Sequence, residues 1–368
     1  MRLPVMERNG ERIIDTEELK AMVDLFIERG FTYFDVAYTY HDGKCEEAMR
    51  RALVERHLRE RFLLADKLPT MLIRNEEHQE QLFFEQLRRC GVDYFDRYLI
   101  HCATKAFYQK AQLNRSFEFA ARLKREGYAR QIGFSYHDAP ELLEEILSRY
   151  PEVDFVQLQI SYMDWELTPI QARRSYETAL RHGKPVVAMC PLKGGMLAAP
   201  PRRAEQLLRR ARPDAEPASW ALRYAASLDG VETVLSGMSS LRQMRENIAF
   251  MEHFEGLDEQ EYTTLEKVAA LTARLTPVQC TRCGYCIPTC PQTIPIPDDL
   301  WLLNDDTAAD HADADRRRKA YLQTSRGRGL ASACIECYNC EAACPQHLRI
   351  VDWLRQVASR FEQVPHPA

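Results

Sequence analysis

The sequence predicts an α/β fold, a (β/α)8 TIM-type barrel followed by a small, mostly α-helical domain. Two observations predict it. Short apolar runs alternate with longer amphipathic segments up to about residue 255, and eight of the twelve cysteines fall in two runs after residue 279. Because single cores stop growing near roughly 250–300 residues, a chain of 368 residues is expected to hold two modules. We expect a barrel over 1–255, a connecting helix over 256–275 and a metal-binding domain over 276–368.

The strand candidates share apolar cores rich in aromatic and β-branched residues. They are 31–37, 62–68, 95–101, 131–137, 155–161, 185–190 and 232–237. Amphipathic helices are expected between them, for example over 16–30 and 75–91, where apolar residues recur at three- and four-residue steps. This spacing suits a (β/α)8 barrel, whose reactive side chains lie at the C-terminal ends of the strands.

The strand candidates number seven, whereas an eightfold barrel needs one more. The first strand of such a barrel should lie just before MRLPV, at the start of the chain. We therefore expect either a shortened start, with the first barrel strand missing or truncated, or a terminal segment that substitutes for it.

The composition argues against several classes of function. The formal net charge of −5 is spread along the chain, so no nucleic-acid partner or anionic membrane surface is expected. No apolar run reaches the roughly 18–20 residues that span a bilayer, and the N-terminus lacks the apolar core of a signal peptide. We expect a cytoplasmic protein. The isolated cysteines argue against a disulfide framework; they are Cys45, Cys90, Cys102 and Cys190.

The remaining cysteines form two C-x2-C-x2-C-x3-C-P runs, the bacterial ferredoxin pattern, in which the fourth cysteine ligates the other cluster. The pattern predicts two [4Fe–4S] clusters. One is expected on Cys280, Cys283, Cys286 and Cys344, and the other on Cys334, Cys337, Cys340 and Cys290. Zinc is the alternative, but a zinc site needs only two C-x2-C pairs, and eight ligands in this order favour clusters.

The segment between the two cysteine runs is expected to be mostly helical. This resembles the α-helical ferredoxin domains attached to larger redox enzymes more than a free-standing electron carrier. The charge run 310–319 is expected to be a solvated helix face, and the basic segment 200–213 an exposed loop and helix.

Four polar residues lie at or near the ends of three consecutive strand candidates. They are Asp35, Tyr40, Lys67 and His101. An acid, a phenol, an amine and an imidazole at neighbouring strand ends form a candidate proton-transfer site, because a nearby ammonium favours the tyrosinate and a carboxylate keeps that ammonium charged. Each residue alone could instead be structural.

These residues lie in segments that resemble the aldo-keto reductase family over roughly 1–255. The resemblance rests on YFDVAYTY, LADKL, DRYLIH, IGFSYH, FVQLQIS, MCPLKGGML and SGMSSLRQMRENI, which follow one another in family order. The cysteine domain is similar to that of the iron–sulfur-containing branch of the family.

The resemblance implies an NAD(P)(H)-dependent oxidoreductase that interconverts a carbonyl and an alcohol on a small-molecule substrate. Tyr40 would be the proton donor, Lys67 would lower the pKa of Tyr40, and Asp35 would hold Lys67. His101 would orient the carbonyl. Tyr38 is the rival phenol, but its offset of three residues from Asp35 does not match the family motif.

The resemblance also implies a set of residues that bind the dinucleotide. Ser135 and Gln157 would bond the nicotinamide carboxamide, and Met189 would lie against its ring. The pyrophosphate would meet the loop 191–197, with Pro191, Leu192 and Gly194, and the adenine end would meet Gly237, Gln243, Glu246 and Asn247. Gln243 stands where NADPH-selective members often carry arginine, so the choice between NAD and NADP stays open.

Three hypotheses for the whole protein follow. In the first, the barrel handles hydride and the clusters pass single electrons to or from a redox protein partner. In the second, the clusters only stabilise their domain, because binding energy at a metal site is folding energy. In the third, the protein is a non-catalytic cofactor-binding subunit for electron transfer or redox sensing. The first needs a flavin or radical between hydride and clusters, and the sequence shows no flavin motif.

Overall fold

The computed structural model describes residues 2–8, 10–167, 170–309 and 313–362, and it divides into two compact units. The barrel unit comprises residues 1–160, 164–191 and 222–256. The cysteine unit comprises residues 161–163, 192–221 and 257–368. This division differs from the limits expected from the sequence, because it assigns residues 192–221 to the cysteine unit.

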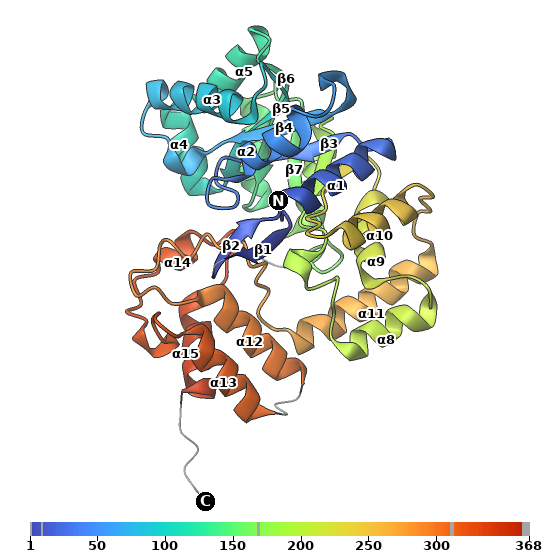
Figure 1. Ribbon diagram of the computed structural model, residues 1–368, viewed down its shortest axis with the longest axis vertical. Helices are drawn as coiled ribbons and strands as arrows, with labels where there is room; N and C mark the ends of the chain where they lie inside the picture. The colour runs from blue at the N-terminus through green and yellow to red at the C-terminus, as the bar shows by residue number, and fades with distance from the viewer. Residues whose placement is uncertain (1, 9, 168–169, 310–312, 363–368) are drawn as a thin grey trace, which may run out of the picture. The chain divides into compact units, whose positions relative to one another are not determined.

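Seven parallel strands form a nearly closed barrel, and each pairs with the next strand in chain order (Figure 1). They are β3 (Tyr33–Asp35), β4 (Leu63–Leu68), β5 (Phe95–Ala103), β6 (Ala129–Tyr136), β7 (Phe155–Gln159), β8 (Val186–Met189) and β9 (Val231–Val234). Each strand overlaps one of the seven sequence candidates, so the predicted barrel class is confirmed. Among the described residues, β1 (Val5–Arg8) and β2 (Glu11–Ile14) form a separate antiparallel hairpin.

Two helices of the barrel unit overlap the helices predicted over 16–30 and 75–91 and begin at capping side chains. For α1 (Thr16–Glu28), the Asp15 side chain accepts a hydrogen bond from Glu18 N at 3.0 Å. For α3 (Glu76–Cys90), Asn75 caps the start and Gly91, with φ 71°, ends the helix in the left-handed conformation. The others are α2 (Cys45–Met49), α4 (Lys105–Leu113), α5 (Ser116–Arg125), α6 (Pro140–Arg149), α7 (Ala172–Arg181) and α10 (Leu241–Met251).

The barrel interior is filled by a layer of apolar side chains, so it is a packed core. The layer consists of Ala65, Leu99, Phe155 and Val187, all fully buried. Gly133 on β6 leaves room for this layer, because a Cβ atom there would lie 2.7 Å from the Phe155 ring. The next inward-facing position lies two residues further along each strand. At this position β4, β5 and β7 carry the polar residues Lys67, His101 and Gln157.

The cysteine unit is mostly helical, as predicted. Its helices are α8 (Arg202–Ala211), α11 (Glu259–Leu275), α12 (Ile296–Ala308), α13 (Ala314–Thr324), α14 (Asn339–Ala342) and α15 (Ile350–Phe361), while α9 (Pro217–Ala226) crosses the division between the units. Helices α12, α13 and α15 pack together (Figure 1). Helix α11 lies within the predicted 256–275 helix and begins with a capping box of Asp258 and Glu261. Of the predicted charged face 310–319, residues 310–312 lie outside the described residues.

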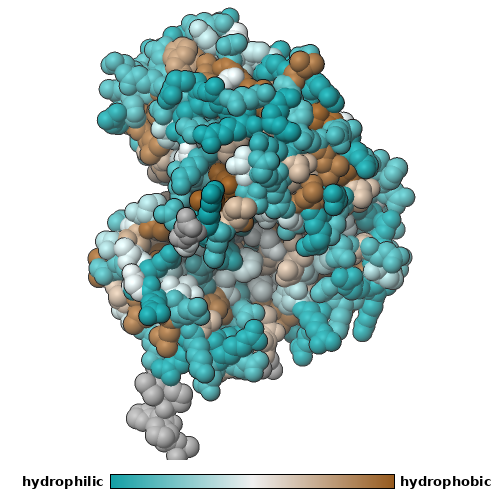
Figure 2. All heavy atoms as spheres, viewed as in Figure 1, coloured by the Kyte–Doolittle hydropathy of each residue, from teal (hydrophilic) through white to brown (hydrophobic). Residues whose placement is uncertain are grey.

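The face of the molecule in Figure 2 is largely hydrophilic, with scattered apolar patches. Among the described residues, no helix combines the length and hydropathy needed to cross a membrane.

The buried carboxyl of Asp299 on α12 makes the stability of the cysteine unit depend on pH. Neither carboxyl oxygen has a hydrogen-bond partner among the described residues. Burial, and then the charge of Asp298, raise the pKa of Asp299 to about 8. Because the folded state holds this proton more tightly than the unfolded state, stability falls as pH rises from about 4 toward 8.

We therefore expect Asp299→Asn to flatten this slope, which can reach about 1.4 kcal/mol per pH unit. The measurement is the thermal midpoint of wild type and variant at pH 6, 7, 8 and 9. The exposed Asp305, paired with Arg317 at 3.0 Å, provides the control, and Asp305→Asn should keep the wild-type slope. Equal slopes in all three proteins would contradict the prediction.

Candidate active site and cysteine pockets

A buried lysine lies at the centre of the candidate site in the barrel unit. Lys67 on β4 is fully buried, and its Nζ lies 2.7 Å from Asp35 Oδ2 at the end of β3. The same Nζ donates a hydrogen bond to the Val36 carbonyl at 2.8 Å. The carboxylate and the carbonyl thus replace the water that a buried ammonium loses.

The phenol of Tyr40 and the imidazole of His101 lie beside this lysine. Lys67 Nζ is 5.0 Å from the centroid of the Tyr40 ring, and the Tyr40 and His101 rings are 6.0 Å apart and nearly perpendicular. The four residues proposed from the strand ends are therefore neighbours in the folded barrel.

The rival phenol lies elsewhere. The ring of Tyr38 stacks under Arg89 of α3, at 4.7 Å, and its hydroxyl contacts Glu85 at 3.5 Å. Its surroundings also raise the pKa of Tyr38, first through burial and then through the charge of Glu85. This is the opposite of what a proton-exchanging phenol requires.

The imidazole of His101 is held in its neutral form. Burial, and then the positive charge of Lys67, place the pKa of His101 well below its ordinary value. A neutral imidazole carries one N–H and one acceptor nitrogen, so it can donate a hydrogen bond to a substrate oxygen without adding a charge.

The next strands contribute the residues expected at the nicotinamide. Ser135 on β6 and Gln157 on β7 are paired in register, and both are buried. Ser135 Oγ accepts a hydrogen bond from Cys102 N at 2.8 Å, and Gln157 Nε2 contacts Met189 Sδ at 3.4 Å. Gln157 Oε1 is buried with no hydrogen-bond partner within the described ranges. A buried acceptor of this kind fits a ligand that carries an N–H donor, such as a carboxamide.

The residues expected near the adenine lie on and before α10. Asn247 Nδ2 donates to Ser236 Oγ at 3.0 Å, and Gln243 Oε1 accepts from Ser239 N at 2.8 Å. Glu246 is exposed and pairs with Arg242 at 2.6 Å. Gly237 lies in the loop between β9 and α10, and Pro191 follows β8 by two residues. Leu192 and Gly194 belong to the cysteine unit.

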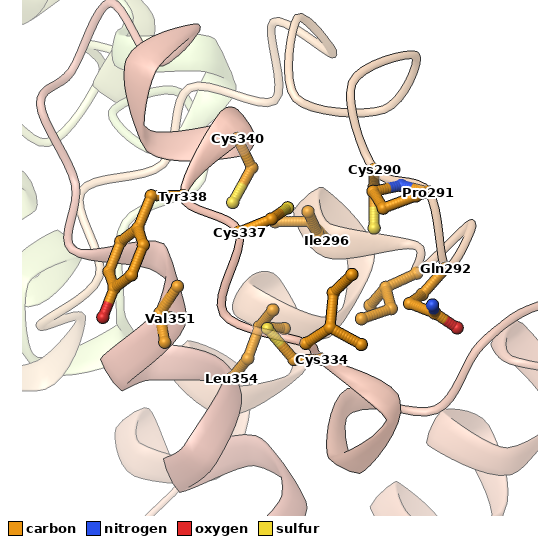
Figure 3. A pocket seen from close by; sticks show the side chains of 12 residues that line it. Cys290, Pro291, Gln292, Ile296, Cys334, Cys337, Tyr338, Cys340, Val351 and Leu354 are labelled. Carbon is orange, nitrogen blue, oxygen red and sulfur yellow. The ribbon is translucent and has the colours of Figure 1, made fainter.

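The eight cysteines of the two runs gather in two pockets of the cysteine unit. The first pocket is lined by residues that include Cys280, Cys283, Cys286 and Cys344. The lining of the second includes Cys290, Cys334, Cys337 and Cys340, which surround a common space (Figure 3). In each pocket the fourth cysteine comes from the other run. That each set ligates one cluster remains a prediction.

Sequence reasoning missed a buried cluster on the outer side of β4. The ligand atoms of Glu46, Asp66 and Cys90 lie within 4.8 Å of one another, and Arg89 pairs with Glu46 at 2.5 Å. Burial, and then the charge of Glu46, raise the pKa of Asp66 well above its ordinary range. Strand alternation was the available signal, because it turns Asp66 away from the barrel interior when Lys67 turns toward it.

Gln86 of α3 extends this cluster to the backbone of Lys67. It donates from Nε2 to Glu46 Oε1 at 3.1 Å and to the Lys67 carbonyl at 3.0 Å. Its own oxygen accepts from the Tyr98 hydroxyl at 2.7 Å. The outer cluster thereby holds β4 at the residue whose side chain enters the candidate site.

The parallel barrel, the neighbouring side chains of Asp35, Lys67 and His101, and the cysteine-rich extension define an α/β barrel protein with a candidate active site at its strand ends. The model of the aldo/keto reductase family matches residues 6–270, and the chain belongs to that family and so to the oxidoreductases. A second model, described as a 4Fe-4S dicluster domain, matches residues 279–349. The C-terminal part is therefore a ferredoxin-type domain.

Curated relatives resemble the barrel part of the chain. "Uncharacterized oxidoreductase YqkF" of Bacillus subtilis (strain 168) is 26% identical over 270 residues, which is 64% of this chain and 83% of the relative. An aldo-keto reductase of Mycobacterium avium (strain 104) is 27% identical over 267 residues, 70% of this chain and 86% of the relative.

Solved structures share the fold. The holo form of the aldo-keto reductase AKR11C1 from Bacillus halodurans aligns with a TM-score of 0.58 at 22% identity, over 73% of this chain and 96% of that one. An aldo/keto reductase from Klebsiella pneumoniae in complex with NADP and acetate aligns with a TM-score of 0.55 at 23% identity, over 69% and 86%. At these identities the likeness concerns the fold.

Because Lys67 and Asp35 form a buried ion pair, we expect replacement of Asp35 to lower the stability of the barrel strongly. Asp35→Asn leaves a buried ammonium without its counter-charge, which should cost about 3–5 kcal/mol. The double variant Asp35→Asn/Lys67→Met should recover most of that loss, because no charge is then buried. Urea unfolding followed by circular dichroism measures both.

The exposed pair of Asp24 and Arg56 is the control, since Asp24→Asn should cost only about 0–1 kcal/mol. A cost for Asp35→Asn as small as that of the control would show that the buried pair does not hold this end of the barrel.

Proposed function

We propose that the protein is an NAD(P)(H)-dependent oxidoreductase that interconverts a carbonyl and an alcohol on a small molecule, with Tyr40 as the proton donor. The observation that carries the proposal is the position of the fully buried Lys67 Nζ, which lies 2.7 Å from Asp35 Oδ2 and 5.0 Å from the centroid of the Tyr40 ring. Bound nicotinamide would supply the hydride in reduction and accept it in oxidation.

The residues around Tyr40 suit proton transfer to a carbonyl oxygen. The ammonium of Lys67 favours the tyrosinate electrostatically, so the phenol can release its proton more readily. Asp35 Oδ2 accepts a hydrogen bond from Lys67 Nζ at 2.7 Å and so holds the lysine in place. His101, neutral and beside Tyr40, can orient the same oxygen through an N–H hydrogen bond. Lys67 and His101 are both buried, and Tyr40 is half-buried.

The same end of the barrel suits a nicotinamide. Gln157 Oε1, which has no hydrogen-bond partner in the described part of the chain, can accept from a carboxamide N–H, and Ser135 stands beside it in the paired strand. The thioether of Met189 offers a soft apolar surface to the ring. We propose that residues 191–197 bind the pyrophosphate and that Gly237, Gln243, Glu246 and Asn247 bind the adenine end. Both NADP and NAD are candidates, because Gln243 carries no charge to meet a 2′-phosphate.

We further propose that each cysteine pocket holds one [4Fe–4S] cluster. The ferredoxin-type spacing, the match to a dicluster domain and the four-cysteine lining of each pocket support this assignment. One cysteine of each pocket, Cys283 in the first and Cys337 in the second, is exposed. An exposed ligand gives a cluster a short path to a redox protein partner, so electron exchange with such a partner is part of the proposal.

Replacement of the phenol tests the catalytic assignment. Tyr40→Phe should lower the rate of carbonyl reduction by about 10²–10⁴-fold, because the oxygen loses its proton donor. The assay follows NADPH oxidation with a panel of small aldehydes and ketones, and fluorescence titration checks that NADPH still binds. Tyr38→Phe is the control and should stay within about twofold of wild type. Comparable rates for Tyr40→Phe and wild type would assign the proton to another group.

Replacement of a cluster ligand tests the role of the clusters. Cys337→Ser should lower the iron and sulfide content while the barrel reaction with NADPH continues, because the proton-transfer residues belong to the barrel unit. Electron transfer to a one-electron acceptor dye should fall in the same variant. If dye reduction by the chemically reduced variant matched wild type, a purely structural role for the clusters would be favoured.

A further inference from the structure

The segment 192–197, which follows β8, is packed into the cysteine unit against two residues of the first pocket. These residues are Thr281 and Gln346, and both line the space between Cys280, Cys283, Cys286 and Cys344. Neither lines the second pocket. The segment that we propose as the pyrophosphate loop therefore contacts the wall of one cysteine pocket specifically.

The contact at Gly194 is a close approach of two backbones. Gly194 has φ 70°, and a Cβ atom there would lie 2.2 Å from the carbonyl oxygen of Thr281 and 2.6 Å from its Cα. Since the obstacle is backbone, no rotation of a flexible side chain can relieve it. The position thus requires glycine both for its conformation and for its contact.

The contact at Lys193 is a buried polar one. Its side chain is fully buried, and Nζ lies 3.5 Å from Gln346 Oε1, two residues after Cys344. Three residues further on, Met196 Sδ lies 3.5 Å from Thr276 Oγ1, and Thr276 stands four residues before Cys280. The segment therefore contacts the chain near both parts of the sequence that line the first pocket, before Cys280 and after Cys344.

We infer that the segment 192–197 couples dinucleotide binding to the first cluster. A cluster in the first pocket orders Thr281 and Gln346, and these residues hold the segment in the conformation that receives a pyrophosphate. By thermodynamic linkage a bound dinucleotide then stabilises the first cluster by the same factor, and the second cluster is outside this coupling. The dinucleotide part of this inference rests on the proposed function, whereas the contact between the segment and the pocket does not.

A pair of glycine variants tests the contact without any dinucleotide. Gly194→Ala adds a methyl group that collides with Thr281, whereas Gly327→Ala adds one at a similar φ of 74° with nothing within 4 Å. Iron release from the anaerobically reconstituted full-length protein is followed with a coloured chelator. The first cluster would hold half of the iron. Gly194→Ala should release that half at least about fivefold faster than wild type, and the release rate of Gly327→Ala should stay within about twofold of wild type.

Lys193→Met is a second variant that adds no backbone strain, and it should also speed the release of half of the iron. Equal rates of iron release for Gly194→Ala and Gly327→Ala would show that the contact with Thr281 does not stabilise the first cluster. Equally faster release of all the iron would also contradict the proposal, because the effect would then not be specific to the first pocket.

NADPH tests the second part. With wild type, saturating NADPH should slow the release of half of the iron by about fivefold or more, and Gly194→Ala should lose most of this protection. If NADPH binds wild type but leaves iron release unchanged, the coupling is wrong while the proposed function stands. If NADPH does not bind at all, both the proposed function and the inferred coupling to a dinucleotide are wrong. The comparison of Gly194→Ala with Gly327→Ala then tests only whether the segment stabilises the first cluster.

Discussion

The ammonium of Lys67, fully buried inside the barrel, is the constraint on which the candidate site depends. Removing such a group from water costs several kcal/mol, and the cost is offset only if a counter-charge and further acceptors are fixed nearby. Asp35 and the Val36 carbonyl provide them at 2.7 and 2.8 Å. The pair joins β3 to β4, so the turn that carries Tyr40 starts from a defined position. The chemistry proposed for Tyr40 and the local stability of the barrel thus both depend on the ion pair between Lys67 and Asp35.

The two faces of β4 show how a strand links a site to the helices outside it. Inward-facing Lys67 enters the candidate site, and outward-facing Asp66 joins a buried network with Glu46, Gln86 and Cys90. Because side chains alternate along a strand, adjacent residues serve opposite sides of the barrel wall. Gln86 also bonds the Lys67 carbonyl, so α3 holds the strand at the site. Buried polar groups of this kind stabilise a fold only when they are paired.

The middle of the chain serves the C-terminal unit as well as the barrel. Residues 192–221 belong to the cysteine unit, and within that unit α8 packs against α11. The segment that leaves β8 contacts the first cysteine pocket before the chain returns to the barrel at residue 222. The ferredoxin-type domain is therefore completed by a piece of chain from inside the barrel sequence. The coupling that we infer between dinucleotide binding and the first cluster rests on this contact.

By itself the sequence determined the elements and their order. Apolar periodicity located all seven barrel strands and the helices at 16–28 and 76–90, because such periodicity is a local property. The cysteine spacing predicted two sets of four ligands because it reflects local loop geometry. The strand-end pattern also grouped Tyr40 with Lys67, but only the tertiary structure placed Tyr38 under Arg89 and showed that Gln157 Oε1 has no hydrogen-bond partner among the described residues. It also brought Lys193 and Gly194 against Gln346 and Thr281 of the first pocket, since contacts between residues 153 and 87 positions apart leave no trace in local patterns.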